Sequence, residues 1–164
     1  MEFREMRRKR QQLPTGESIE ILRRATSGTL ALLGDGGYPY AVPLSYVWAD
    51  GRLYFHSALA GHKVDAVRAC DKASFCVIEQ DLVQPEHYTT HYRSVIAFGR
   101  IRIVEDEAER LLAARLLGNR YNPGNGESLQ KELEKGLARM LVLRFEIEHL
   151  TGKEAIELVA QSRH

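Results

Sequence analysis

Two glycine-containing turn sequences separate three runs of apolar, β-branched and aromatic residues in the first third of the chain. The first turn, at 34–37, lies between the runs 29–33 and 38–48, and the second, Asp50-Gly51, is followed at once by the run 53–55. Both are typical of β-hairpins, because Asp-Gly favours tight turns that match strand twist. Three consecutive antiparallel strands exclude a Rossmann sheet here, and no Gly-x-Gly-x-x-Gly or Walker sequence supports a classical nucleotide fold.

Hydrophobic periodicity predicts the remaining elements. Helices are expected at 17–26, 61–69, 106–119, 128–136 and 152–160, and strands at 72–79, 92–104 and 140–150. Gly28 should end the first helix, Ser128 should cap the fourth, and Gly99 should bend or bulge the long strand. The sequence Thr-Gly-Lys-Glu at 151–154 resembles a capping box for the last helix. About six strands without βαβ alternation indicate a small barrel or sandwich with peripheral helices, α+β by content.

Pro43 interrupts the middle run of the three. Proline has no N–H to donate to a strand ladder, so we expect this strand to be bulged or to have one free edge at that point. Such irregular positions often face a ligand.

Composition limits the function classes. The chain has 164 residues, 44% apolar and 27% charged, which suits one globular domain with a single core. A formal charge of +1 gives no global field that would attract nucleic acid or anionic lipid. Five basic and two acidic side chains nevertheless fall within residues 1–13, so a solvated, poorly ordered basic arm is expected at 1–14.

Apolar runs and cysteines bear on the cellular location of the protein. The first thirty residues contain no apolar run long enough for a signal peptide. No segment approaches the ~20 apolar residues of a membrane span. Cys70 and Cys76 match no metal or redox signature, so buried free thiols are expected. The sequence therefore predicts a soluble cytoplasmic protein with no nucleic-acid or membrane partner.

The segment 54–63 has the composition of an anion site. It runs from a strand end through a loop of small residues into a helix start, where free N–H groups and the positive helix end attract a phosphate. Ser57 can donate a hydroxyl, and His62 and Lys63 supply cationic donors. An ordinary loop with two exposed basic side chains is the alternative.

Other chemistry has little support. His87 and His91 offer only two ligands, so no metal site is predicted. No nucleophile elbow, HExxH sequence or paired-carboxylate arrangement occurs. His56 fits a structural histidine as well as a functional one. The aromatic residues of the first three strands fit a core, or the wall around a flat aromatic ligand.

Taken together, the motifs resemble the FMN-binding split-barrel superfamily of pyridoxamine 5′-phosphate oxidase-like proteins, and within it the nitroimidazole-resistance (Nim) group. The resemblance spans nearly the whole chain, and the joint order of its motifs is more specific than any one of them. The segments that carry it are 4–9 (REMRRK), 28–32 (GTLAL), 38–46 (YPYAVPLSY), 53–57 (LYFHS), 61–63 (GHK), 93–100 (RSVIAFGR) and 151–155 (TGKEA).

The resemblance implies a mainly β (α+β) fold, a six-stranded antiparallel split barrel with peripheral helices. One FMN-binding domain would span 1–164, with the basic arm at 1–14 and a C-terminal helix and tail at 152–164. It also implies a homodimer with FMN in grooves between the subunits. The implied cofactor-binding residues are Tyr40, Val42, Pro43, Leu44, Ser45, His56, Ser57, His62, Lys63 and Ser94.

The family positions imply distinct roles. Main-chain groups near Val42–Ser45 would contact the polar edge of the flavin ring, and His56 and Ser57 would lie near its ribityl-phosphate side. His62 and Lys63 would bind the phosphate. His62 stands where the oxidases have an arginine, and a histidine cannot form the two parallel hydrogen bonds that an arginine makes to a phosphate. Ser94 stands where the oxidases place a glutamine that reaches the flavin.

The implied activity departs from that of the true oxidases. Their C-terminal tryptophan and arginine pattern is absent, and Trp48 is the only tryptophan, in the wrong strand. We therefore expect an FMN-dependent oxidoreductase of the Nim type that reduces a small flat acceptor such as a nitroaromatic, with His56 as the reactive-side residue and proton donor. Alternatives are a non-catalytic flavin-binding or redox-sensing protein and a tetrapyrrole-binding protein that uses His56, His62, His87 or His91 as axial ligands.

Overall fold

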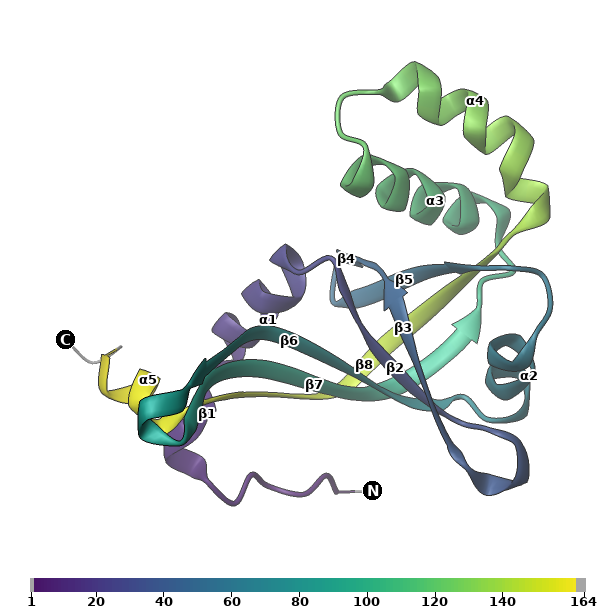
Figure 1. The fold of residues 1–164 in the computed structure, drawn as a ribbon. Helices are drawn as coiled ribbons and strands as arrows, with labels where there is room; N and C mark the ends of the chain where they lie inside the picture. Colours follow the sequence, from purple (N-terminus) through teal and green to yellow (C-terminus); the bar gives the residue numbers. More distant parts are fainter. Residues whose placement is uncertain (1, 162–164) are drawn as a thin grey trace.

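One antiparallel sheet forms the centre of the structure, which is a computed structural model describing residues 2–161 (Figure 1). The strands of that range are β1 (Gln12–Leu13), β2 (Ser27–Leu33), β3 (Pro39–Ser45), β4 (Val47–Ala49), β5 (Arg52–Ser57), β6 (Lys72–Gln84), β7 (Thr89–Ile103) and β8 (Leu141–Glu154). Its α-helices are α1 (Thr15–Arg24), α2 (His62–Ala69), α3 (Glu107–Tyr121), α4 (Gly126–Gly136) and α5 (Ile156–Gln161).

Both predicted hairpins form, but the segment between their turns is not one strand. β2 pairs with β3 and β4 pairs with β5, whereas the expected strand at 38–48 is interrupted at Tyr46. The Tyr46 ring is buried, and its hydroxyl donates a hydrogen bond of 2.7 Å to the Leu22 carbonyl of α1. β3 and β4 therefore lie at opposite ends of the order β3-β2-β6-β7-β8-β5-β4, which corrects the expectation of three consecutive paired strands.

The strand order is that of an open split barrel. Every strand pairing is antiparallel. Among the described strands, β3 and β4 have one partner each, so hydrogen bonds do not close the sheet. Figure 1 shows the helices placed around the margins of the twisted sheet. The predicted split barrel with peripheral helices is confirmed, and the short strands β1 and β4 add to the six expected ones.

The predicted irregularity at Gly99 is confirmed. The register of β7 against β8 shifts between Phe98 and Gly99. A Cβ on Gly99 would lie 1.9 Å from the carbonyl oxygen of Glu146, so the backbones approach too closely for a side chain. A glycine at this position therefore lets two long strands stay paired through the shift.

The core lies on the inner face of the barrel. Tyr46, Phe55 and Phe75 form an aromatic cluster, with centroids 5.0 Å apart for Tyr46–Phe75 and 5.2 Å for Phe55–Phe75. Helix α1 adds Ile21 and Leu22, which are fully buried against this cluster. Most of the aromatic residues of the early strands are therefore core, as the simpler interpretation expected.

Three helix signals gave wrong boundaries. α1 ends at Arg24, and Gly28 lies inside β2, where a Cβ would come within 2.5 Å of the Phe75 ring. α4 begins at Gly126, so Ser128 lies inside the helix and is not its cap. Residues 151–154 continue β8 because Gly152 pairs with both β1 and β7. Strand pairing thus overrides the local capping-box pattern.

The two ends of the chain differ in part from expectation. The five basic residues of the arm at 1–14 are exposed, as expected, but Phe3 stacks on His149 at 4.7 Å, and Gln11 and Leu13 are buried. At 152–164, the first three residues belong to β8, and residues 162–164 lie outside the described range.

Cys70 and Cys76 are unpaired but only partly buried, which corrects the expectation of buried thiols. Burial raises the pKa of the Cys76 thiol. Within residues 2–161, no helix has both the length and the apolar character needed to cross a membrane.

Candidate functional site

β3 is an edge strand, and it carries five of the predicted cofactor-binding residues. It pairs with β2 along its whole length, from Pro39 to Ser45, and no other described strand pairs with it. The expectation of a free edge at Pro43 is thus confirmed. Tyr40, Val42 and Leu44 pack against the core, whereas Pro43 and Ser45 are exposed. An edge strand leaves alternate N–H and C=O groups unpaired, so β3 can offer main-chain hydrogen bonds to a ligand.

The second part of the site is the connection from β5 to α2. Side chains alternate at the end of β5, with Phe55 and Ser57 buried and His56 exposed between them. Gly61 follows with a φ of 125°, a conformation that glycine adopts without strain. Its carbonyl accepts hydrogen bonds from the N–H groups of Val64 and Asp65, which starts α2 at His62.

In this connection, Ser57 and Lys63 carry polar groups that have no partner among residues 2–161. Ser57 is only 5% exposed, and no hydrogen bond to another described side chain or backbone group holds its hydroxyl. Lys63 is partly buried in the first turn of α2, and no carboxylate of residues 2–161 pairs with its ammonium group. Burial lowers the pKa of Lys63 below the ordinary lysine value. A partly desolvated cation without a counter-ion favours binding of an anion.

His62 has contacts within the protein that the sequence did not predict. Its ring stacks on Tyr40 with centroids 4.1 Å apart and 17° between the planes. Its Nε2 accepts a hydrogen bond of 3.4 Å from the backbone N–H of Asp35, in the turn between β2 and β3. The Asp35 carboxylate lies 3.9 Å from the same nitrogen. His62 therefore joins the start of α2 to β3 and brings these two predicted parts of the site together.

Ser45 and His56 line a cavity of about 370 Å³ between the sheet and the helices α3 and α4. Ser45 ends β3 and His56 lies in β5, so the cavity adjoins the interruption between the two hairpins. Tyr121, at the end of α3, is another lining residue. Its hydroxyl donates a hydrogen bond to the Thr26 carbonyl and accepts one of 3.0 Å from the Tyr46 N–H, which fixes α3 beside this point of the barrel.

Residues 14–154 match a sequence model of the family described as pyridoxamine 5′-phosphate oxidase. The chain belongs to this family. The match covers both parts of the site and all the long strands of the sheet. Among curated proteins, none is similar enough to this member of the family to count as a relative.

Solved structures with the same fold include flavin-binding proteins. A candidate 5-nitroimidazole antibiotic resistance protein from Bacteroides thetaiotaomicron has 18% identity and a TM-score of 0.76, covering 87% of this chain and 86% of that one. A FAD-binding protein from Mesorhizobium loti has 28% identity and a TM-score of 0.63, covering 88% and 96%. A FAD and heme binding protein from Mycobacterium smegmatis has 24% identity and a TM-score of 0.74, covering 88% and 73%.

Ser94 lies apart from the other predicted residues of this oxidase-family chain. In β7 it stands opposite Ile78 of β6 and Lys153 of β8, on the outer face of the sheet. β2 and β6 separate β7 from β3 in the strand order. A single subunit therefore does not bring Ser94 beside the edge of β3.

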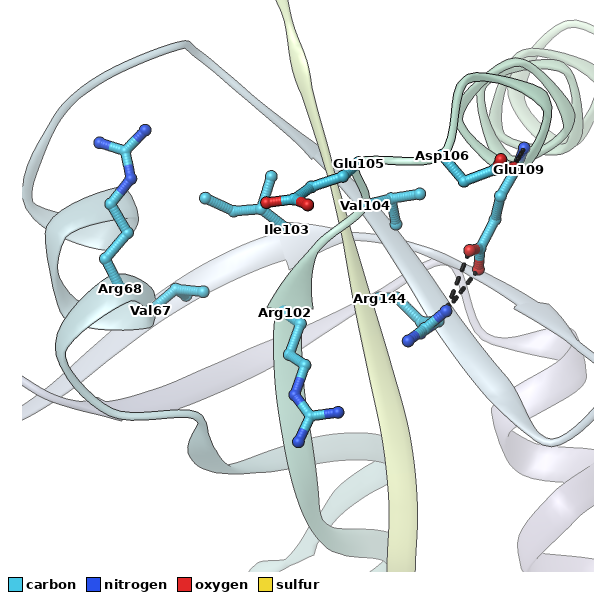
Figure 2. Close-up of a pocket in the computed structure, with 9 residues that line it drawn as sticks. All are labelled: Val67, Arg68, Arg102, Ile103, Val104, Glu105, Asp106, Glu109 and Arg144. Atoms are coloured by element: carbon cyan, nitrogen blue, oxygen red, sulfur yellow. Dashed lines mark hydrogen bonds and ion pairs between the residues drawn. The ribbon is translucent and has the colours of Figure 1, made fainter.

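A second cavity, of about 490 Å³, contains none of the predicted site residues. Figure 2 shows it between α2, the end of β7 and the start of α3. Arg144 forms two hydrogen bonds with the Glu109 carboxylate, at 2.9 and 3.1 Å, and Arg102 pairs with Asp71 at 3.1 Å. Desolvation raises the pKa of the Asp71 carboxyl, but the hydrogen bonds and charges of Arg100 and Arg102 together outweigh it, so the pKa is lowered. These ion pairs hold strands and helices together.

The histidines proposed as alternative axial ligands lie at different ends of the sheet. His87 and His91 flank the β6–β7 connection, which Figure 1 shows at the opposite end from α2 and its first residue, His62. Among the described residues, no cluster of three or more histidines, cysteines and carboxylates could hold a metal ion. One chain therefore does not bring His87 or His91 together with His62.

Sequence reasoning missed the α3–α4 wall of the site. The helix ending at Tyr121 was predicted close to its true position, but no local pattern showed which strand it would face. The one local signal was the aromatic residue just before the Asn-Pro-Gly-Asn-Gly loop, because a tyrosine hydroxyl can both donate and accept hydrogen bonds.

Proposed function

We propose that this chain is an FMN-dependent oxidoreductase of the Nim type that reduces a small flat acceptor such as a nitroaromatic. The observation that carries the proposal is a pair of polar side chains, Ser57 and Lys63, that have no partner in the described part of the chain and lie near the free edge of β3. Family membership and the FAD-binding proteins of the same fold support a flavin as the ligand. Free Cys70 and Cys76 are compatible with the reducing cytoplasm.

The phosphate end of FMN fits the β5–α2 connection. The Lys63 ammonium group would supply the charge, and the Ser57 hydroxyl would donate a hydrogen bond. The first N–H groups of α2 lie beyond Gly61, where an anion also interacts favourably with the helix dipole. His62, held by Tyr40 and Asp35, would act mainly by positioning the turn next to this phosphate.

The ring end of FMN fits the free edge of β3. Unpaired main-chain groups from Val42 to Ser45 would bind the polar edge of the flavin, and Pro43 leaves one position of that edge without a donor. Tyr40 and Leu44 would support the strand from the core side. The flavin, when bound, supplies the electron or hydride transfer.

The proposal includes a homodimer. One row of paired residues crosses the outer face of the sheet through Pro43, Thr29, Cys76, Ile96 and Thr151. Apolar side chains on this face remain exposed, with Ile78 at 66%, Ile96 at 40% and Phe98 at 41%. An exposed apolar face of this kind is typical of a subunit interface. A partner seated there would bring its own Ser94 to the flavin.

His56 is the proposed proton donor. Its side chain is exposed on β5 and lines the same cavity as Ser45, so it can contact an acceptor that lies between the strand edge and α3. Its ring can hold a proton and pass it to a reduced acceptor within hydrogen-bond distance.

The test compares His56→Ala with His87→Ala in FMN-loaded protein. His87 is exposed at the opposite end of the sheet, so its replacement is a matched control. We expect His56→Ala to lower the turnover of a nitroaromatic by roughly 10²-fold while FMN affinity changes little. Equal losses of turnover and affinity would make His56 a cofactor ligand only. FMN binding without turnover of any acceptor would favour the non-catalytic flavin-binding protein.

A further inference from the structure

One lysine lies on the face of the sheet that the proposed dimer would cover. Beside the row through Pro43 and Ile96, a second row of paired residues contains Ala41, Ala31, Ser74, Phe98 and His149. On the other side of the Pro43 row, Ser27 pairs with Ser45, Ile78 with Ser94, and Ser94 with Lys153. Among all these residues Lys153 is the only one with a fixed charge, and none is an aspartate or a glutamate.

Lys153 is held in place on this face. It pairs with Ser94 of β7 on one side and with Gln12 of β1 on the other. Its ammonium nitrogen lies 5.5 Å from the centre of the Tyr92 ring, and the Tyr92 hydroxyl accepts a hydrogen bond of 3.3 Å from Gln11. Lys153 is partly buried, and no carboxylate of residues 2–161 pairs with its ammonium group. Its charge is therefore fixed in position and has no counter-ion within the chain.

A second copy of the chain offers no counter-ion either. A partner that covers this face would desolvate the Lys153 ammonium group, which is unfavourable unless an anion meets it. In a two-fold symmetric dimer both subunits present the same patch, and the rows of this patch contain no carboxylate. Glu5 lies in the arm beside Thr151, but it is already paired with Lys9 at 2.7 Å. The counter-ion of Lys153 should therefore belong to a bound molecule.

The place of Lys153 on the face indicates which part of the flavin it would meet. The proposed site has its phosphate end at Lys63, beside Tyr40, and its ring end at Ser45. The proposed dimer brings Ser94 to the flavin of the other subunit, and Lys153 is the direct neighbour of Ser94. Paired strands lie about 4.8 Å apart and a lysine is longer than a serine, so a flavin within reach of Ser94 is also within reach of Lys153. A two-fold axis parallel to the strands would place this pair at the Ser45 end.

We propose that Lys153 of each subunit contacts the flavin ring held by the other subunit and stabilises its reduced form. This inference rests on the proposed function. The oxidised flavin ring is uncharged. When the ring takes up two electrons and one proton at N5, a negative charge remains on N1 and the C2 carbonyl. A lysine ammonium group at that edge lowers the free energy of the anion and so raises the redox potential of the flavin.

The measured quantity is the two-electron redox potential of FMN bound to the full chain, with dithionite as reductant and a reference dye in equilibrium. We expect Lys153→Gln to make reduced flavin at least about tenfold less favoured relative to oxidised flavin, which lowers the potential by about 30 mV. Lys153→Arg keeps the charge and should keep most of the potential. Lys131→Gln is the matched control, because it removes the same charge from an exposed position of α4, outside the sheet face.

A mixed dimer tests which subunit supplies the lysine. It joins a Lys63→Ala chain to a Lys153→Gln chain, and different affinity tags separate it from the two homodimers. FMN at a concentration too low for the Lys63→Ala site would occupy the site on the Lys153→Gln chain, whose partner has an intact Lys153. We expect this dimer to have the wild-type potential. The potential of the Lys153→Gln homodimer would instead place the contact within one chain.

Several results would overturn the proposal. These are an unchanged potential in Lys153→Gln, the lowered potential in the mixed dimer, or loss of oxidised FMN from Lys153→Gln, which would make the lysine a phosphate contact. Dissociation of Lys153→Gln into monomers would also overturn it, because the lysine would then pair with a carboxylate of the other subunit. If Lys153→Gln does not fold, Lys153→Met allows the same comparison, because its unbranched side chain can also pack on Tyr92.

The same measurements separate this inference from the proposed function. Wild-type protein that retains no flavin would reject the proposed function and the inference together. Wild-type protein that retains FMN, with the same potential in Lys153→Gln, would reject the inference alone.

Discussion

Lys63 is the residue on which flavin binding depends most in this account. It is partly buried and has no counter-ion among the described residues, so its charge is available to a phosphate. We expect Lys63→Ala to weaken FMN binding by roughly 1.5–3 kcal/mol, the range for a charged hydrogen bond. Because Lys63 has no ion pair to lose, the melting temperature of the flavin-free form should change little. Titration by flavin fluorescence and thermal unfolding measure the two effects, and a collapse of flavin-free stability would make Lys63 structural.

The lowered pKa of Lys63 gives a second prediction at the residue scale. Burial favours the neutral amine, so the flavin-free protein loses this charge at a lower pH than an ordinary lysine would. FMN affinity should therefore decrease as pH rises through that lowered pKa, and bound phosphate should raise the pKa again. Lys63→Arg keeps its charge throughout this range, so its FMN affinity should not show the alkaline decrease. An identical alkaline decrease in both proteins would assign the titration to another group.

At the scale of the elements, Gly99 keeps β7 and β8 paired through their register shift. A Cβ there would collide with the Glu146 carbonyl at 1.9 Å, and neither backbone can move without breaking pairs. We expect Gly99→Ala to lower the free energy of unfolding by at least roughly 1–3 kcal/mol. Gly16→Ala is the control, because an added Cβ in α1 meets nothing within 4 Å and alanine favours a helix. Urea unfolding measures both, and equal stability of the two variants would contradict the packing argument.

Sequence patterns predicted elements whose signals are local. The two turns, the start of α2 after Gly61 and the irregularity at Gly99 each depend on neighbouring residues, and the structure has all four. The predicted site residues other than Ser94 lie on β3 and on the β5–α2 connection, where strand, loop and helix follow one another in sequence, and the stack of His62 on Tyr40 brings these two segments together. Ser94 and the α3–α4 wall could not be placed in this way, because strand order and helix docking decide where they lie.

Long-range contacts also account for the two wrong expectations about strands. Tyr46 interrupts a run with strong β-propensity because its hydroxyl binds α1, which is distant in sequence. The apparent capping box at 151–154 is a strand because β1 and β7 both pair with it. In each case a long-range contact decided between two locally allowed structures.

At the scale of the whole molecule, the account predicts a homodimer held by the outer face of the sheet. Ile96→Asp places a charge in the middle of that face and should yield monomers that no longer bind FMN. Tyr88→Asp is the control, because Tyr88 is 99% exposed at the far end of the β6–β7 hairpin. Analytical ultracentrifugation with flavin titration gives the result. A dimer that persists in Ile96→Asp would place the interface elsewhere.

The most direct test of the central claim is the visible absorption spectrum of the purified protein after incubation with FMN and desalting in phosphate-free buffer. The account predicts flavin bands at near one per chain in the wild type and their loss in Lys63→Ala. The same measurement with FAD identifies which flavin the site takes. Wild-type protein that retains neither flavin would contradict the account.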